Sequence, residues 1–489
     1  MTVSDKDLLS VQEARTMVER AFEAQKIWAN ATQQQVDRVC AAMAQAAFLG
    51  AERLGRMAAE ETGFGVPEHK KLKNEFASRH LWSRIADIQT VGLLRKDEKN
   101  RIYEIAWPMG VVAALVPSTN PTSSVMNKIL ISVKARNGIV LAPHPTAVKC
   151  CLATAKVMID AAENAGAPPG LINCLTTISL NGTQELMAHK RTAVILATGG
   201  SEMVRVAHSM GKPAYGVGPG NVPAYVDRSA DLEKAARYIV ASKAFDYSVI
   251  CATEQAVIAD RPIAARLRQL MEAEGAYFVD ESQADALRKT LFHSDGSINV
   301  KSVGKSPQFL AAMAGIRVPA HARILVANLK EVGREEPLSR EKMTTVLGFY
   351  EANGWEAGCE RCIEMINFGG RGHSLIIHAT DEKVIMAFGL EKPVFRIGVN
   401  TMGTLGTIGL TTNVMPSLTL GPGGIGGSIT GDNIGVYHLF NIKRMAFETS
   451  RPPEMAMMSG TTPAGPIYGP APGEIESVVE EVVRQIIKA

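Results

Sequence analysis

The chain has 489 residues, 46% of them hydrophobic and 21% charged, which is close to globular averages and excludes a largely disordered or collagen-like chain. Lysine and arginine number 52 against 49 aspartate and glutamate, so the formal charge is +3. Without clustered cations this balance does not favour a nucleic-acid surface. The length predicts about three domains or subdomains.

The sequence predicts a cytoplasmic protein. No apolar run approaches the roughly 20 residues of a membrane span, and the longest, 110–116, has the length of a strand. Charged residues stand near the N-terminus, where a signal peptide would be apolar. The seven cysteines form no paired framework, as is typical of a reducing compartment. Cys359 and Cys362 have the spacing of half a zinc site or a redox motif, but we interpret them as two unlinked thiols and expect no metal.

Helices are expected first, over residues 11–62, because apolar residues recur there at spacings of three and four. From about residue 102 the pattern becomes one of strands alternating with helices. Strands are expected at 111–116, 139–143, 171–175 and 193–197, and helices at 123–136, 147–165, 182–188 and from 201 to about 211. This alternation predicts a parallel α/β sheet.

A second alternating block begins near residue 231. Its strands are expected at 256–259, 323–327, 374–379 and 395–400. Prolines and glycines over 451–473 then indicate a linker. The last segment, 474–489, is predicted to form an amphipathic helix.

Loops that follow strands are the place to look for a site, because parallel sheets bind ligands beyond the carboxyl ends of their strands. Asn120, between two prolines, carries an amide that can donate to a developing oxyanion; taken alone, the motif is more typical of an ordinary Asx turn. The turn at 198–200 precedes a helix and suits an anion or a closely approaching ring; alone, it can also be a plain tight turn. The glycine-rich stretch 216–221 lacks the dinucleotide fingerprint spacing.

Cys251 stands between a long helical stretch and a strand. A loop cysteine can be exposed and can have the lowered pKa that a reactive thiolate needs. A buried, inert thiol is the alternative interpretation.

Taken together, these loops resemble the aldehyde dehydrogenase superfamily, and within it the CoA-acylating branch. The resemblance covers roughly 10–450 and is carried, in order, by VPSTNPTSSVMNKILISVKARNGIVLAPHP, ILATGG, GKPAYGVGPGN, ICATEQAVIA, EKMTTVL, GGRGHS and PSLTLGPGG. It implies an α/β fold with a Rossmann-type cofactor domain, an α/β catalytic domain and a small oligomerisation arm. The expected parts are a dinucleotide-binding domain at 1–230 with an arm near 99–108, a catalytic domain at 231–433, an oligomerisation strand at 434–450, the linker at 451–473 and a targeting helix at 474–489.

The resemblance implies catalytic roles for several residues. Cys251 is the expected nucleophile, and Asn120 with the backbone N–H of Cys251 is the expected oxyanion hole. His373 matches a histidine typical of the acylating branch, although a structural role is an equal alternative. Hydrolytic members carry a glutamate base in the segment that corresponds to 216–221 of this chain. The position of that glutamate corresponds to about Val217 here. The loss of this base agrees with acyl transfer to CoA rather than to water.

Other residues are expected to bind the cofactor. The resemblance assigns Thr198, Gly199 and Gly200 to the dinucleotide-contacting turn, Glu341 to the nicotinamide ribose and His144 to the loop that passes the adenosine end. NAD is the family default, and NADP stays open.

The predicted reaction therefore converts a short-chain aldehyde, NAD and CoA to acyl-CoA and NADH through a thioacyl-enzyme. A non-acylating dehydrogenase that releases free acid is the alternative, and an inactive structural subunit is a third. Segment 401–427, small and without cations, is expected to line a pocket for a short neutral aldehyde. At least a dimer is expected, formed through the arm and the strand at 434–448.

The C-terminal helix suggests a partner. One face of 474–489 is apolar, and its other face begins with glutamates and ends with cations. An isolated helix of this length is marginal in water, so it is expected to fold on a surface. The arrangement resembles encapsulation peptides of bacterial microcompartments, which predicts binding to a shell protein; docking on its own oligomer is the alternative. An acidic polar face disfavours membrane binding.

Overall fold

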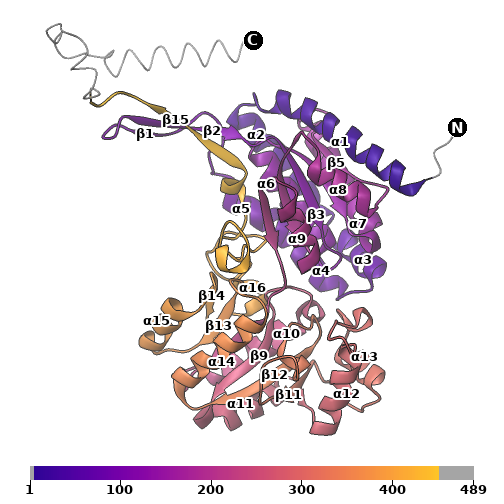
Figure 1. Cartoon of the computed structure of the whole chain (residues 1–489), viewed down its shortest axis with the longest axis vertical. Coiled ribbons are helices and arrows are strands. Elements are labelled where there is room, and N and C mark those ends of the chain that lie inside the picture. Colours follow the sequence, from indigo (N-terminus) through magenta and orange to yellow (C-terminus); the bar gives the residue numbers. More distant parts are fainter. Residues whose placement is uncertain (1–4, 451–489) are drawn as a thin grey trace, which may run out of the picture.

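Two parallel sheets and one small antiparallel sheet organise the chain, and the computed structural model describes residues 5–450. Figure 1 shows two α/β bodies, one formed mainly by the first half of the chain and one by the second, with a strand arm that projects from the first. The α/β fold expected from the sequence is confirmed.

The first body, here called the cofactor unit, has a five-stranded parallel sheet in the order β5-β4-β3-β6-β7. Its strands are β3 (Val111–Val116), β4 (Gly138–Pro143), β5 (Ile172–Cys174), β6 (Thr192–Thr198) and β7 (Ala214–Val217). Every residue of β3 and β4 is buried, as a strand covered on both faces requires. The strand order reverses between β3 and β6, and ligands bind at such a point in open α/β sheets.

Helices cover both faces of this sheet (Figure 1). The helices of the cofactor unit are α1 (Lys6–Trp28), α2 (Gln33–Leu49), α3 (Ala51–Thr62), α4 (Pro67–Glu75), the π-helix η1 (Phe76–His80), α5 (Leu81–Ile85), α6 (Pro121–Lys134), η2 (Pro145–Ala147), α7 (Val148–Asn164), α8 (Leu180–Ala188) and α9 (Ser201–Ser209). The helices from α4 to α5 were not predicted from the sequence. The reason is that the buried residues of α4 are polar: Lys70, Lys73 and Asn74.

The second body, here called the catalytic unit, has a seven-stranded sheet in the order β10-β11-β12-β9-β8-β13-β14. Its strands are β8 (Val222–Val226), β9 (Glu254–Asp260), β10 (Ala276–Phe278), β11 (Ile324–Asn328), β12 (Val346–Ala352), β13 (Leu375–His378) and β14 (Ile397–Val399). Its helices are α10 (Leu232–Ala244), η3 (Phe245–Ser248), α11 (Arg261–Ala273), α12 (Glu281–Leu291), η4 (Val300–Ser302), α13 (Pro307–Ala314), η5 (Pro337–Ser339), α14 (Gly354–Phe368), α15 (Glu382–Glu391), α16 (Gly403–Gly406), η6 (Gly424–Gly426) and η7 (Val436–His438).

The chain passes from one sheet to the other between β7 and β8. Because β8 pairs with β9 and β13, the catalytic sheet begins before residue 230, where the sequence analysis places the domain boundary. Pro223 lies inside β8, and a proline within a run of apolar residues argues against a strand when only the sequence is read.

The arm is an antiparallel sheet of β1 (Leu93–Asp97), β2 (Ile102–Pro108) and β15 (Phe440–Ala446), in the order β1-β2-β15. It lies away from both bodies (Figure 1). Trp107 and Ile442 on it are 53% and 41% exposed. The expected linker at 451–473 and helix at 474–489 lie outside the described residues. Within 5–450, no helix combines the length and the apolarity that crossing a membrane requires.

Candidate active site

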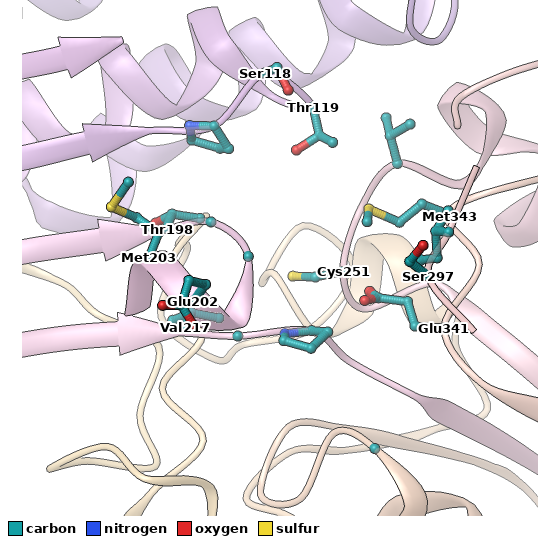
Figure 2. Close-up of a pocket in the computed structure, with 18 of the residues that line it drawn as sticks. Ser118, Thr119, Thr198, Glu202, Met203, Val217, Cys251, Ser297, Glu341 and Met343 are labelled. Atoms are coloured by element: carbon teal, nitrogen blue, oxygen red, sulfur yellow. The ribbon is translucent and has the colours of Figure 1, made fainter. Parts of the chain in front are cut away.

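A cleft of about 1950 Å³ opens between the cofactor unit and the catalytic unit. Figure 2 shows Cys251 in its middle, with Thr198 and Val217 on the side of the five-stranded sheet and Glu341 and Met343 on the opposite side. The carboxyl ends of β3, β4, β6 and β7 all supply residues to its wall. The cleft thus lies where the strand order predicts a ligand.

Cys251 is the one cysteine of the chain's seven that is not buried. Its neighbours Ile250 and Ala252 are buried in the same hydrophobic cluster as Val116 and Val217 of the cofactor unit. Packing of these two side chains holds the thiol between the two units. The apolar residues on either side of Cys251 therefore anchor the loop, while the sulfur faces the cleft.

The resting thiol is protonated, because the pKa of Cys251 is raised and not lowered as a reactive thiolate needs. Burial, followed by the charge of Glu341, raises the pKa of Cys251 to about 12, while Arg396 acts in the opposite direction. The backbone N–H groups of Cys251 and Ala252 lie close enough to the sulfur to lower this pKa. A nucleophilic role for Cys251 therefore requires that the thiol lose its proton during the reaction.

Asn120 lies directly against the loop of Cys251. Its Nδ2 donates to the carbonyl of Val249 at 3.1 Å and to Thr119 Oγ1 at 3.2 Å, and its Oδ1 accepts a hydrogen bond from Lys73 Nζ at 2.5 Å. This pattern points the amide N–H groups toward the nucleophile's loop. The structure thus brings together Asn120 and Cys251, which the sequence separates by 131 residues.

Glu341 points into the cleft on the side of the catalytic unit (Figure 2). Its Oε1 accepts the N–H of Gly220 at 3.2 Å. Burial raises the pKa of this carboxyl to about 7. At neutral pH the group can therefore both accept and release a proton.

The turn of Thr198, Gly199 and Gly200 lines the cleft at the end of β6. Gly200 is the N-cap of α9 and provides no side-chain hydrogen bond to the helix, so the first-turn N–H groups have no side-chain partner. A Cβ at Gly200 would meet nothing within 4 Å. An open helix N-terminus at a strand-order reversal fits the pyrophosphate of a dinucleotide.

The two histidines from the sequence analysis lie in different surroundings. His144 is exposed on the cleft wall, where its Nδ1 accepts the N–H of Thr146 at 3.3 Å. His373 is 1% exposed and is not among the residues that line the cleft. It lies behind Gly220. A Cβ added at Gly220 would be 2.3 Å from the Cys251 carbonyl oxygen and 3.0 Å from His373 Nδ1.

His373 is electrically neutral. Burial, assisted by the charge of Arg396, lowers the pKa of its imidazole to about 3. Its Nδ1 contacts Ser374 Oγ at 3.0 Å, and its Nε2 has no hydrogen-bond partner in the described structure. His373 therefore packs against Gly220, beside the loop of Cys251, and does not face the open cleft.

Residues that the sequence analysis did not single out complete the surroundings of the thiol. Arg396, which is 6% exposed, donates from Nη1 to the carbonyls of Gly421 at 3.0 Å and Gly431 at 2.8 Å, and its charge lowers the pKa of Cys251. In the sequence, the one signal for this residue is an arginine at the start of the strand expected at 395–400. Within 5–450, no group of three histidine, cysteine, aspartate or glutamate side chains is placed to hold a metal ion.

Comparison with known proteins agrees with this geometry. The family model described as "Aldehyde dehydrogenase family" matches residues 2–282. The chain is 41% identical over 424 residues to the aldehyde-alcohol dehydrogenase 2 of Entamoeba histolytica, covering 85% of this chain and 49% of that protein. The chain therefore spans about half the length of such curated relatives.

Solved structures match over nearly the whole chain. An acetylating aldehyde dehydrogenase from Geobacillus thermoglucosidasius is 51% identical, with a TM-score of 0.91, and the match covers 92% of this chain and 100% of that one. A propionaldehyde dehydrogenase from the fucose utilisation microcompartment of Clostridium phytofermentans is 26% identical, with a TM-score of 0.80 and coverages of 90% and 98%. With its cysteine between two α/β units and a family model that matches more than half of its length, this chain belongs to the aldehyde dehydrogenase family.

Proposed function

We propose that this protein is a CoA-acylating aldehyde dehydrogenase that acts on short-chain aldehydes with NAD. The observation that carries the proposal is the hydrogen bond from Asn120 to Val249, which places an amide donor against the loop of the one cysteine that faces the cleft. The acetylating relative supports the acyl-transfer part of the proposal.

The chain's own groups supply the first half of the reaction. The sulfur of Cys251 bonds to the aldehyde carbon while its proton leaves, and Glu341, with a pKa near 7, is the acceptor in the cleft whose charge most affects that thiol. The oxygen of the thiohemiacetal becomes negative and accepts hydrogen bonds from Asn120 Nδ2 and the Cys251 N–H. Both N–H groups of Asn120 have acceptors here, Thr119 Oγ1 and the carbonyl of Val249, so one of these contacts must open when the oxyanion forms.

The proposed dinucleotide site is the cleft wall at Thr198, Gly199 and Gly200, and Glu341, which lines the same cleft, is proposed to bind the nicotinamide ribose. A bound NAD would supply the acceptor for the hydride that leaves the former aldehyde carbon, and this oxidation would leave a thioester on Cys251. The sulfur of CoA then bonds to this carbonyl carbon, the bond to the sulfur of Cys251 breaks, and the proton of the CoA thiol passes to Cys251 as the acyl-CoA forms. Asn120 Nδ2 and the Cys251 N–H donate to the oxyanion both when the aldehyde is attacked and when CoA attacks the thioester.

Transfer to CoA rather than to water is supported by Val217. This residue is 2% exposed, lines the cleft and stands where hydrolytic relatives are expected to carry a glutamate base. Glu341 is the observation that favours the alternative, release of free acid, since a carboxylate with a pKa near 7 can activate water. Product analysis decides between them: acyl-CoA that forms only with CoA supports the proposal, and free acid at an equal rate without CoA would refute it.

The aldehyde is proposed to be small and uncharged. From segment 401–427, the residues that line the cleft are Ile408, Leu418 and Leu420, all apolar. Such a wall favours a short alkyl chain over a carboxylate or sulfonate. Relative rates with acetaldehyde, propanal, succinate semialdehyde and sulfoacetaldehyde test this specificity.

The arm is the basis for the proposed assembly, and the C-terminal segment is the basis for the proposed location. Exposed Trp107 and Ile442 on the arm support at least a dimer, and scattering that shows a monomer at micromolar concentration would refute it. The segment 474–489 is proposed to bind a microcompartment shell protein, and the microcompartment origin of one structural relative supports this cargo role.

A further inference from the structure

The segment that leads to the nucleophile has a backbone conformation that non-glycine residues rarely adopt. Asp246, Tyr247 and Ser248 have φ values of 49°, 50° and 69°. A Cβ makes this left-handed region unfavourable, so three such residues in succession persist only where the surroundings hold them. Cys251 follows three residues after Ser248. The contacts of Asp246 therefore help to set the position of the thiol.

Helix α4 and its N-cap residue Val66 bind the carboxylate of Asp246. The Oδ1 atom accepts the N–H of Val66 at 2.8 Å, and Oδ2 accepts Lys70 Nζ at 2.9 Å and a short hydrogen bond from Lys73 Nζ. Gly65 makes the approach possible, since a Cβ there would lie 1.9 Å from Oδ1. We call Lys70, Asp246 and Lys73 the lysine–aspartate cluster; each side chain is at most 1% exposed.

The two lysines of this cluster have different second partners. Lys70 Nζ donates to the backbone carbonyl of Thr119 at 2.7 Å, whereas Lys73 Nζ donates to Oδ1 of Asn120 at 2.5 Å. On its other side, Asn120 Nδ2 donates to the carbonyl of Val249, two residues before the nucleophile. Within the cluster, Lys73 is thus the lysine that touches the side chain assigned to the oxyanion.

We propose that Lys73 is a positioning residue for the amide of Asn120, an inference that rests on the proposed function. In its protonated form, paired with Asp246, Lys73 only donates, so its contact directs the amide oxygen toward α4 and the amide N–H groups toward the loop of Cys251. An amide turned the other way would present its oxygen to the developing negative charge. The ammonium also polarises the amide, which makes its N–H a stronger donor to the oxyanion. Asp246 holds Lys73 in place.

Two variants of equal charge separate this role from general support of the fold. Lys73→Met and Lys70→Met each leave one carboxylate with one ammonium, but only the first releases Asn120. Lys73→Met is expected to lower kcat for acyl-CoA formation by about 30- to 100-fold with little change in the KM for aldehyde. Lys70→Met is expected to lower kcat by less than about fivefold. Equal losses in the two variants would overturn the proposal.

Alkylation reports on the thiol without forming an oxyanion. Because Cys251 is the cysteine that is not buried, iodoacetamide labels it selectively. The Lys73→Met variant is expected to react within about twofold of the wild-type rate. Alkylation that falls in parallel with kcat would mean that the substitution displaces Cys251, and the role assigned to Lys73 would be wrong.

A double-mutant cycle completes the test. Because Lys73 acts through Asn120, adding Lys73→Met to Asn120→Ala is expected to lower kcat by less than about a further twofold. Losses that multiply would overturn the positioning role while leaving the oxyanion assignment intact. Wild-type activity in Asn120→Ala alone would instead refute that assignment in the proposed function, and the inference with it.

Discussion

The carboxylate of Glu341 raises the pKa of the Cys251 thiol, and burial is the one influence that is larger. The pKa of Glu341 is itself raised to about 7 by burial. Both carry negative charge when ionised, so ionisation of one group opposes ionisation of the other. The nucleophile and the expected ribose-binding residue are therefore coupled before any ligand binds.

Replacing Glu341 by glutamine is expected to lower the pKa of Cys251. Alkylation by iodoacetamide near pH 8 should then become roughly three- to tenfold faster, because a larger fraction of the thiol is ionised. Glu335→Gln is the matched control, since Glu335 also lines the cleft but is exposed and does not contribute to the shift at Cys251. Unchanged or slower alkylation in Glu341→Gln would contradict the coupling.

The glycine loop after β7 contains a position that cannot carry a side chain. A Cβ at Gly220 would lie 2.3 Å from the carbonyl oxygen of Cys251, whereas a Cβ at Gly218 would meet nothing within 4 Å. Gly220→Ala is expected to shift the nucleophile and lower kcat by about 100-fold. Gly218→Ala should keep the alkylation rate of Cys251 within about twofold of the wild type. An equal loss of kcat in Gly220→Ala and Gly218→Ala would contradict the steric explanation.

Lys128 of α6 predicts a specific pH dependence of stability. Its Nζ donates to the carbonyls of Leu115 and Leu196, both at 2.9 Å, and burial lowers its pKa from 10.5 to about 7. The folded state thus binds this proton more weakly than the unfolded state does. The resulting stabilisation is full above pH 10.5 and is lost as the pH falls toward 7.

Urea unfolding of the wild type and of Lys128→Met at several values between about pH 7 and pH 10 measures this contribution. The free energy of unfolding of the wild type should rise with pH relative to the variant, by up to about 1.4 kcal/mol per pH unit. Curves that stay parallel would show that Lys128 does not titrate with a lowered pKa.

The C-terminal segment is expected to act in targeting and not in catalysis. A chain that ends at residue 450 should keep kcat within about twofold of the full chain, because the described cleft is built from residues before that point. Residues 451–489 fused to a fluorescent protein should form foci in cells that make the shell. Diffuse fluorescence, or loss of activity on truncation, would contradict this prediction.

Much of the fold could be predicted because its central strands are uniformly apolar. The run 111–116 coincides with β3, and 139–143 falls within β4, since strands buried on both faces need continuous apolar residues. The helix α4 could not be found in the same way. Its buried face carries Lys70 and Lys73, whose partners lie on distant segments, so hydrophobic periodicity gives no signal there.

The candidate site could be assembled from loop order and the family resemblance, but its electrostatics could not. The sequence shows Cys251 in a loop, whereas its raised pKa depends on Glu341 and on the packing of two units. His373 lies behind Gly220 and not in the cleft wall, because the contact that puts it there joins segments far apart in the chain. Such contacts are properties of the tertiary structure.

The central claim is that Cys251 carries the acyl group between aldehyde and CoA. Mass spectrometry of the protein after acid quench tests it most directly, with aldehyde and NAD present and CoA withheld. We predict that the peptide containing Cys251 gains the mass of one acyl group, that this adduct disappears on addition of CoA as acyl-CoA forms, and that Cys251→Ala shows neither. NADH accumulation with no adduct on Cys251, or an adduct that CoA does not remove, would contradict the account.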